Sequence, residues 1–166
     1  MTRITRFSAQ IVTLCIFILG LAAAPAATSG PALSRIQDKG ELVLGTSGNM
    51  PPMSHKLDDG EVVGFDIDLA RLMASGMGVK LKIRTMAFNE LLPALQKGDV
   101  DVVISNVTMN PKRNMSVAFV GPYMTSGKCV ITKEERLAKA SEAENLNVPE
   151  TRLAALQGST SAEFIK

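Results

Sequence analysis

Aromatic residues are scarce in this chain, which has no tryptophan, one tyrosine and six phenylalanines. Proteins that bind single-stranded nucleic acid stack bases on aromatic rings, so the scarcity argues against such a surface. An excess of one charge is also missing. The formal net charge is +2, and two of the 18 basic residues, Arg3 and Arg6, lie in a leader that we expect to be removed, leaving 16 basic against 16 acidic residues. We therefore expect no nucleic-acid partner.

Cysteine and histidine are equally few. Cys15 lies in the expected leader, so only Cys129 would remain, and one cysteine cannot form an internal disulfide. Cys129 stands in a short apolar run and is interpreted as a small core residue. His55 is the only histidine and has no second candidate ligand nearby in the sequence, which argues against a zinc site. No phosphate-binding loop or nucleophile motif occurs, and we expect neither a metal nor a cofactor.

The first 26 residues have the pattern of a cleavable signal peptide. Arg3 and Arg6 supply a positive start, and the apolar run at 11–24 is too short for a comfortable membrane span. The segment Ala24-Pro25-Ala26 offers a cleavage site of the A-x-A type. An uncleaved N-terminal anchor is the alternative. We therefore expect an exported, periplasmic protein.

Strand patterns alternate with helix patterns after the leader. Strands are expected at 41–45, 61–64, 80–84 and 99–104, with further strand-like runs at 117–120 and 128–132. Helices are expected at 65–77 and 89–97, a helical turn at 110–114, a loop at 46–53 and a hairpin around the turn at 58–60. Such alternation indicates an α/β fold with a mostly parallel sheet flanked by helices. Ligands of these sheets lie at the carboxyl ends of the strands.

The stretch at 98–123 carries the strongest functional pattern. Its apolar strand ends in Ser105 and Asn106, and a helix then starts at Asn110-Pro111, so free backbone N–H groups gather at one point. Arg113, about one turn further on, can direct its forked guanidinium to the same point, which suits a carboxylate. Taken by themselves, these residues favour the simpler interpretation, in which Arg113 is a solvated helix arginine and the Asn110-Pro111 pair is a helix cap.

Two carboxylates, Asp66 and Asp68, open the helix expected at 65–77. They could indicate acid–base chemistry or a metal site. The preferred interpretation is that Asp66 caps or charges the first helical turn, where the helix dipole favours a negative group.

Several short motifs recur in a fixed order along the chain. They are Gly45-Thr46 followed by Pro51-Pro52, VGFDIDLA at 63–70, LLPAL at 91–95, GDVD at 98–101, PKR at 111–113 and GPY at 121–123. In this order and spacing they resemble the N-terminal lobe of the family 3 periplasmic solute-binding proteins, the amino-acid receptors of ABC importers. The resemblance covers about residues 36–132 and extends more weakly to 164. It implies a periplasmic-binding-protein-like (type II) fold, in which two α/β lobes close over the ligand.

The resemblance also implies roles for single residues. Arg113 stands where the family's arginine grips the ligand α-carboxylate, assisted by the hydroxyl residue at Thr108. Asn106 matches the position whose backbone carbonyl takes the α-ammonium, and Phe88 matches an aromatic that packs on the ligand side chain. Taken alone, Phe88 would be a core aromatic. The complete predicted ligand-binding set is Ser47, Met50, Phe88, Ser105, Asn106, Thr108, Arg113 and, from the second-lobe turn, Thr160.

Two positions bear on ligand choice. Family members that bind cationic amino acids commonly carry an acid near position 47, where this chain has Ser47. Met50 and Met53 flank the Pro51-Pro52 pair where an aromatic is common, and methionine forms an adaptable wall. We therefore expect a neutral or polar amino acid.

The resemblance divides the chain into a signal peptide at 1–26, an N-terminal lobe at 27–132, and a hinge exit with the beginning of an incomplete second lobe at 133–166. The chain is then expected to be a fragment, a truncated product with weak binding, or the partner of a separately encoded second lobe. The expected function is capture of an amino acid and delivery to the membrane permease of an ABC importer, without chemistry. The alternatives are a periplasmic cyclohexadienyl or prephenate-type dehydratase and the ligand-sensing domain of a signalling receptor.

Overall fold

The computed structural model describes residues 30–166, so the signal peptide expected at 1–26 lies outside the described residues. The chain divides into two units, Met1–Arg35 and Ile36–Lys166, and the fold below belongs to the second. Helix α2 (Pro31–Lys39) crosses the boundary between them. Within the part of the chain that the structure describes, no helix is long and apolar enough to span a membrane.

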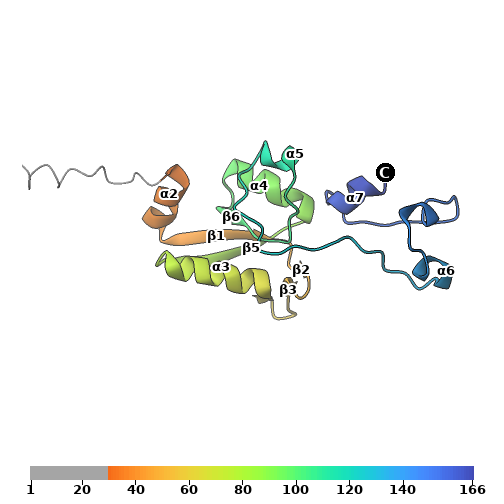
Figure 1. Ribbon diagram of the computed structural model, residues 1–166. Coiled ribbons are helices and arrows are strands. Elements are labelled where there is room, and N and C mark those ends of the chain that lie inside the picture. Colours follow the sequence, from red (N-terminus) through yellow and green to blue (C-terminus); the bar gives the residue numbers. More distant parts are fainter. Residues whose placement is uncertain (1–29) are drawn as a thin grey trace, which may run out of the picture. The chain divides into compact units, whose positions relative to one another are not determined.

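A parallel three-stranded sheet forms the centre of the second unit (Figure 1). Strand β1 (Glu41–Thr46) lies in the middle, with β5 (Lys80–Thr85) on one side and β6 (Val102–Val103) on the other. Strand β1 pairs with β5 over its whole length but with β6 at two positions only. The expected parallel sheet is confirmed. The strand expected at 99–104 is shorter than predicted, because only Val102–Val103 form β6.

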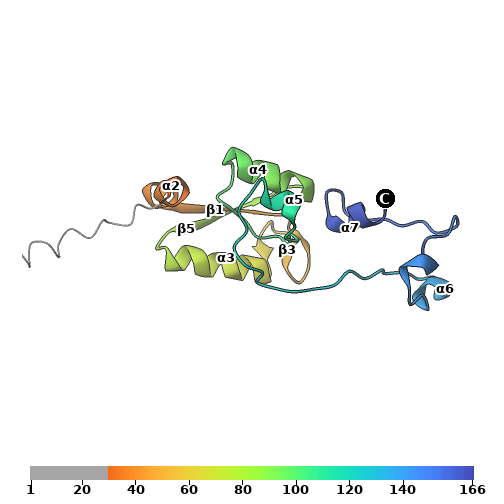
Figure 2. The ribbon, with the colours of Figure 1, turned by 45° about the horizontal axis from the view of Figure 1, so that its top comes forward.

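One helix covers each face of this sheet. Helices α3 (Phe65–Gly76) and α4 (Leu91–Lys97) lie on opposite sides of β1 in both Figure 1 and Figure 2. Ile67 of α3 and Leu44 of β1 are fully buried in one core cluster, and Leu91 of α4 is fully buried as well. Because both faces of β1 are covered, the three consecutive residues at 42–44 are all apolar instead of alternating with polar ones.

A second, antiparallel sheet precedes α3. It contains β2 (Asn49–Met50), β3 (Ser54–Lys56) and β4 (Val62–Val63) in that order. His55 pairs with Val63 across β3 and β4, so the predicted hairpin is confirmed. The segment 46–53, expected to be loop throughout, contains β2 because β3 offers it a hydrogen-bonding partner.

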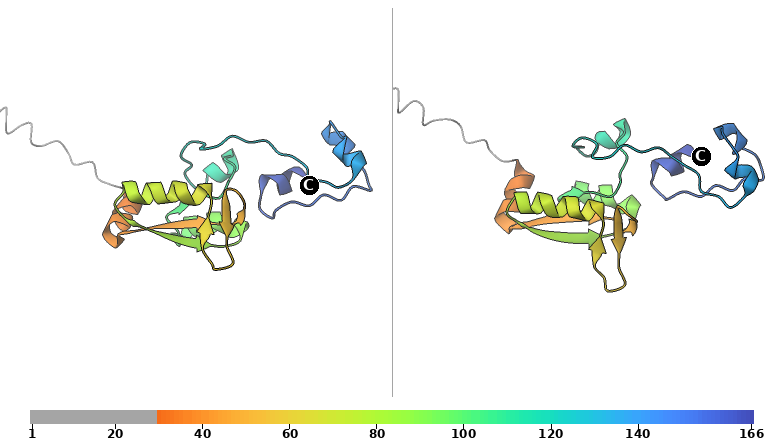
Figure 3. Two further views of the ribbon diagram at one scale, coloured as in Figure 1. Left: turned by 90° about the horizontal axis from the view of Figure 1, so that it is seen from below. Right: turned by 60° about the horizontal axis from the view of Figure 1, so that its bottom comes forward.

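The strand-like runs at 117–120 and 128–132 form no strand, so both expectations were wrong. After α5 (Pro111–Asn114) the chain runs as coil to α6 (Glu135–Ala138), as Figure 3 shows; the 3-10 turn η2 (Ala143–Asn145) and α7 (Thr160–Phe164) follow. Val120 and Ile131 are each 95% exposed, and no strand of the described residues pairs with either run. A strand needs a neighbour to complete its backbone hydrogen bonds. Cys129 is exposed too, so its interpretation as a core residue was wrong.

Candidate ligand-binding site

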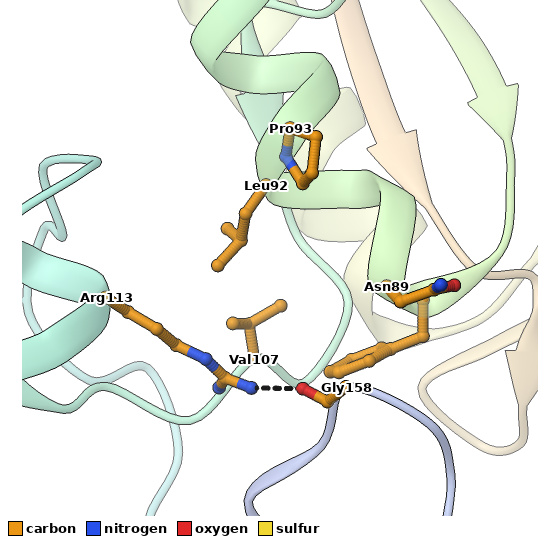
Figure 4. Close-up of a pocket in the computed structure, with 7 residues that line it drawn as sticks. Asn89, Leu92, Pro93, Val107, Arg113 and Gly158 are labelled. Atoms are coloured by element: carbon orange, nitrogen blue, oxygen red, sulfur yellow. Dashed lines mark hydrogen bonds between the residues drawn. The ribbon is translucent and has the colours of Figure 1, made fainter.

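A pocket of about 170 Å³ opens beside α4, at the carboxyl-terminal side of the parallel sheet. Its walls are Phe88 and Asn89 of the 3-10 turn η1 (Phe88–Glu90), Leu92 and Pro93 of α4, Val107, Arg113 and Gly158. Figure 4 shows the side chains of Leu92, Val107 and Arg113 converging on this space. The pocket therefore offers an apolar wall and one cation, which are the two elements that fix an amphipathic small molecule.

Most of the apolar wall comes from η1 and the start of α4, and Val107 adds to it from the loop after β6. Phe88, Asn89, Leu92 and Pro93 stand at spacings that place them on one side of a helix. The opposite side of the same turn carries Leu91, which is buried in the core. Sequence reasoning identified Phe88 and missed the other three. Their helical spacing from Phe88 is the signal that could have found them.

Arg113 is placed by the start of α5. The Asn110 side chain caps this helix by accepting the Arg113 backbone N–H at 2.8 Å, and Pro111 occupies the first turn. The guanidinium donates from Nη1 to the Thr108 carbonyl at 2.8 Å. It also donates from Nη2 to the Gly158 carbonyl at 2.8 Å, the bond that is dashed in Figure 4. A guanidinium has five N–H donors, so these two bonds orient the fork and leave donors for a carboxylate.

Ser47 and Ser105 form a second predicted group, just beyond the ends of β1 and β6. The Ser47 backbone N–H donates to Ser105 Oγ at 3.0 Å, and the Ser105 hydroxyl donates to Ser47 Oγ at 3.1 Å. Ser105 is buried with 1% of its surface exposed. Because Ser105 accepts and donates within this pair, it holds the two loops together, and the Ser47 hydroxyl keeps its own proton to donate elsewhere.

The other predicted residues differ in what they touch. Thr160 donates from its hydroxyl to Thr108 Oγ1 at 3.4 Å, which brings these two predicted residues together beside Arg113. Met50 lies in β2 and is half-buried. No hydrogen bond of the described chain joins Met50 to the other predicted site residues, and it does not line the pocket.

Sequence reasoning placed Asp66 in the first turn of a helix but missed its burial and its long-range partner. Asp66, in the first turn of α3, is fully buried, and its Oδ1 accepts the Tyr123 hydroxyl at 3.0 Å. Tyr123 Oη in turn accepts the Asn106 backbone N–H at 3.1 Å. Asp66 lies in the first helical turn as expected, but no side-chain hydrogen bond caps the helix there. Its partner comes from 57 residues further along the chain, a contact that no local pattern encodes.

Burial governs the ionisation of this pair. It raises the pKa of the Asp66 carboxyl above its ordinary value, and the hydrogen bonds from Tyr123 and Asn106 offset part of the rise. Burial, followed by the negative charge of Asp66, raises the pKa of Tyr123 to about 12. The phenol therefore stays protonated at physiological pH and can donate to Asp66 while accepting from Asn106.

The parallel sheet, its two covering helices and the pocket beside α4 define a lobe of the type II periplasmic-binding-protein class. The structure of the ancestral amino-acid-binding protein AncCDT-1, described as a precursor of cyclohexadienyl dehydratase, superposes with a TM-score of 0.75 at 37% identity, covering 80% of this chain and 58% of that one. The arginine-bound form of domain 1 from the T. maritima protein ArgBP superposes with a TM-score of 0.52 at 42% identity, covering 54% of this chain and 71% of that one.

Residues 42–162 match the bacterial extracellular solute-binding proteins, family 3, and the chain belongs to this family. The arginine-binding extracellular protein ArtP of Bacillus subtilis is 35% identical over 58% of this chain and 38% of its own length. The cyclohexadienyl dehydratase of Pseudomonas aeruginosa is 28% identical over 92% of this chain and 56% of its own length. The chain thus spans between about two fifths and just over half of these curated relatives. Because one relative binds arginine, the expected preference for a neutral or polar ligand is not confirmed.

Proposed function

We propose that this chain is the ligand-binding lobe of an exported receptor that captures an α-amino acid and delivers it to the permease of an ABC importer. The family to which the chain belongs comprises extracellular solute-binding proteins, which supports a role outside the cytoplasm. Export would depend on a cleavable signal peptide at 1–26. Capture involves no bond making or breaking, so the proposed protein is not an enzyme.

One observation carries this proposal, namely the Arg113 guanidinium at the edge of an apolar-walled pocket. An α-amino acid has a carboxylate that pairs with a forked cation and a side chain that packs against an apolar wall. Arg113 supplies the fork, and Phe88 and Leu92 supply the wall. Two main-chain carbonyls hold the guanidinium in one orientation, which lowers the ordering cost of bidentate binding.

The remaining predicted residues complete the proposed site. Thr108 and Thr160 stand beside Arg113 as hydroxyl partners of the carboxylate, and the Asn106 carbonyl is assigned to the α-ammonium. Ser47 and Met50 are assigned to the ligand side chain, with Ser105 supporting Ser47. In this proposal Ser47 provides a neutral hydroxyl where a cationic ligand would need an acid, so a neutral or polar amino acid is favoured.

A single lobe is a reasonable unit for binding. The ArgBP structure with arginine bound consists of domain 1 of that protein, and it is similar to 54% of this chain. Here the segment that carries Gly158 and Thr160 already contacts Arg113 and Thr108. These contacts support a carboxylate site built from residues of this chain.

The similarity to cyclohexadienyl dehydratase gives a second candidate, the loss of water together with carbon dioxide from a cyclohexadienyl acid such as prephenate. This reaction needs a general acid within reach of the substrate. None of the residues that line the pocket is a carboxylic acid, and the buried carboxyl of Asp66 is not among them. The receptor function is therefore preferred, and the two candidates differ in whether prephenate is consumed.

The test uses the chain expressed from Met1, recovered after export, and screened against the common L-amino acids by thermal shift and calorimetry. A ligand at about 100 times its Kd stabilises the folded chain by roughly 2.7 kcal/mol, which gives a clear shift in melting temperature. Arg113→Ala is expected to weaken binding at least tenfold, because the carboxylate loses its charged partner. Lys112→Ala is the matched control, since its exposed ammonium pairs with Glu163 outside the pocket.

Equal affinity in wild type and Arg113→Ala would refute the carboxylate assignment. A cooperative melt with no shift for any amino acid would refute binding by this lobe alone. Turnover of prephenate by the purified chain would instead establish the dehydratase.

A further inference from the structure

We infer that Tyr123 is a positioning residue for the amino-acid site, acting through the backbone of Asn106. The inference rests on the proposed function, in which the Asn106 carbonyl accepts the ligand α-ammonium. Tyr123 does not line the pocket and needs no contact with the ligand. Its effect is to fix the conformation of the loop that follows β6.

The hydroxyl of Tyr123 joins two parts of the lobe. It accepts the Asn106 backbone N–H at 3.1 Å and donates to Asp66 Oδ1 at 3.0 Å. Asp66 belongs to α3, whereas Asn106 belongs to the loop at the end of the parallel sheet. One phenol therefore ties the binding loop to a helix that is anchored in the core.

Asn106 requires such a tie because of its backbone conformation. Its φ is +52°, and among the described residues it is the only non-glycine residue with a positive φ. Asparagine tolerates this left-handed region better than most residues, but the conformation still needs support from its surroundings. Asn106 is exposed to solvent, so packing against neighbouring residues does not supply that support. The hydrogen bond from its N–H to Tyr123 does.

The ring of Tyr123 is itself held in place. It stacks on Phe65, with ring centroids 6.1 Å apart and an interplanar angle of 27°. Its hydroxyl bonds to a carboxylate that is fully buried and cannot move without disturbing α3. Because the phenol is protonated at physiological pH, both of its hydrogen bonds persist under working conditions. The Asn106 N–H and the peptide plane that it shares with Ser105 are thus held in place, which constrains the backbone from which the Asn106 carbonyl extends.

The residue before Asn106 is held by a separate contact. Ser105, which precedes Asn106, is buried and hydrogen-bonded to Ser47 at the end of β1. Asn106 is therefore fixed from one side through Ser105 and from the other through Tyr123. Removing the Tyr123 hydroxyl frees only the second constraint, so it should alter the direction of the Asn106 carbonyl without unfolding the lobe.

The experiment compares wild type with Tyr123→Phe, which keeps the ring and removes the hydroxyl. Calorimetry of the full chain uses two ligand pairs: L-glutamine with its des-amino analogue glutaramate, and L-arginine with 5-guanidinopentanoate. The analogues keep the carboxylate and lack the α-amino group. For the amino acid that wild type binds, Tyr123→Phe is expected to raise Kd about tenfold, against less than twofold for its analogue. A general structural defect would weaken both members of a pair equally.

Phe65→Leu is the matched control, because leucine keeps an apolar side chain beside the Tyr123 ring and leaves the hydroxyl bonds in place. It is expected to change each Kd by less than twofold. Backbone amide exchange measured by NMR provides a readout that needs no ligand. In wild type the exposed Asn106 amide should exchange at least tenfold more slowly than in an unstructured peptide, and this protection should vanish in Tyr123→Phe.

Equal loss for an amino acid and its analogue, or an unprotected Asn106 amide in wild type, would overturn the inference. If wild type binds no amino acid, the proposed function fails. The exchange measurement then decides the positioning role of Tyr123 by itself, because an Asn106 amide protected only when the hydroxyl is present still supports it.

Discussion

Two regions of this lobe carry similar apolar runs, but one run is buried in a sheet and the other is exposed to solvent. In β1, Leu42 and Leu44 are 2% and 0% exposed, with strands on both sides and a helix on each face. In the segment 115–132, defined here as the open segment, Val120 and Ile131 are 95% exposed. Apolar residues alone do not make a strand, because a strand also needs a neighbour that completes its backbone hydrogen bonds.

The proposed binding site lies at the boundary between these regions. Arg113 stands on a short helix between the sheet and the open segment, and it contacts Gly158 beyond that segment. Tyr123, at the centre of the open segment, is hydrogen-bonded to Asp66 of α3 and to Asn106 of the loop after β6. The open segment is therefore attached to the lobe at a few polar points and one ring contact, between Tyr123 and Phe65, instead of through a packed core.

The two regions should differ most in how much stability is lost when an apolar side chain is truncated to alanine. Leu44→Ala should lower the free energy of unfolding by about 3 kcal/mol, because Leu44 is fully buried among Val62 and Ile67. Ile131→Ala should change it by less than about 0.5 kcal/mol, because its side chain is already in water. Urea unfolding followed by circular dichroism measures both. Similar losses in the two variants would show that the open segment is packed as tightly as the sheet.

Replacing a glycine by alanine should also destabilise the two regions to different degrees, with a somewhat smaller difference. Gly64 joins β4 to α3 with φ of +128°, and a Cβ there would lie 2.5 Å from the Met53 carbonyl oxygen. Gly64→Ala is expected to destabilise the lobe by about 2 kcal/mol through backbone strain and this close contact.

Gly127→Ala is the control within the open segment, because a Cβ there meets no atom within 4 Å. It should shift the urea midpoint negligibly. A large loss at Gly127 would mean that the open segment has a tighter conformation than its exposure indicates.

The smallest expected effect is a pH dependence at the point where the two regions meet. The pKa of Tyr123 is raised from 10.0 to about 12 in the folded chain. Between these values the unfolded chain loses the phenolic proton and the folded chain keeps it, so stability falls as pH rises through this window. Tyr123→Phe should remove this part of the fall.

Phenolate absorbance reports this ionisation directly, because the chain has one tyrosine and no tryptophan. The folded chain should titrate near the raised pKa, and the urea-unfolded chain near the ordinary one. A folded chain that titrates like the unfolded one would show that Tyr123 is detached from Asp66.

Much of the fold followed from local pattern. The strands at β1 and β5, the helices α3 and α4 and the β3–β4 hairpin were all predicted, because each has a periodicity or a turn signal within its own few residues. The start of α5 was predicted from the Asn110-Pro111 pair, whose side-chain cap and missing donor act within one turn. The family also followed from the sequence, because its motifs recur in order.

The sequence by itself determined where an apolar strand would end in polar residues and where a forked cation would follow, since both depend on neighbours in the chain. Only the tertiary structure decided that Leu92 and Val107 wall the pocket, that Gly158 meets Arg113, and that Asp66 is anchored to Tyr123. It also decided that the runs at 117–120 and 128–132 would stay open. These outcomes depend on which distant segments come together to exclude water and pair polar groups, and no local periodicity carries that information.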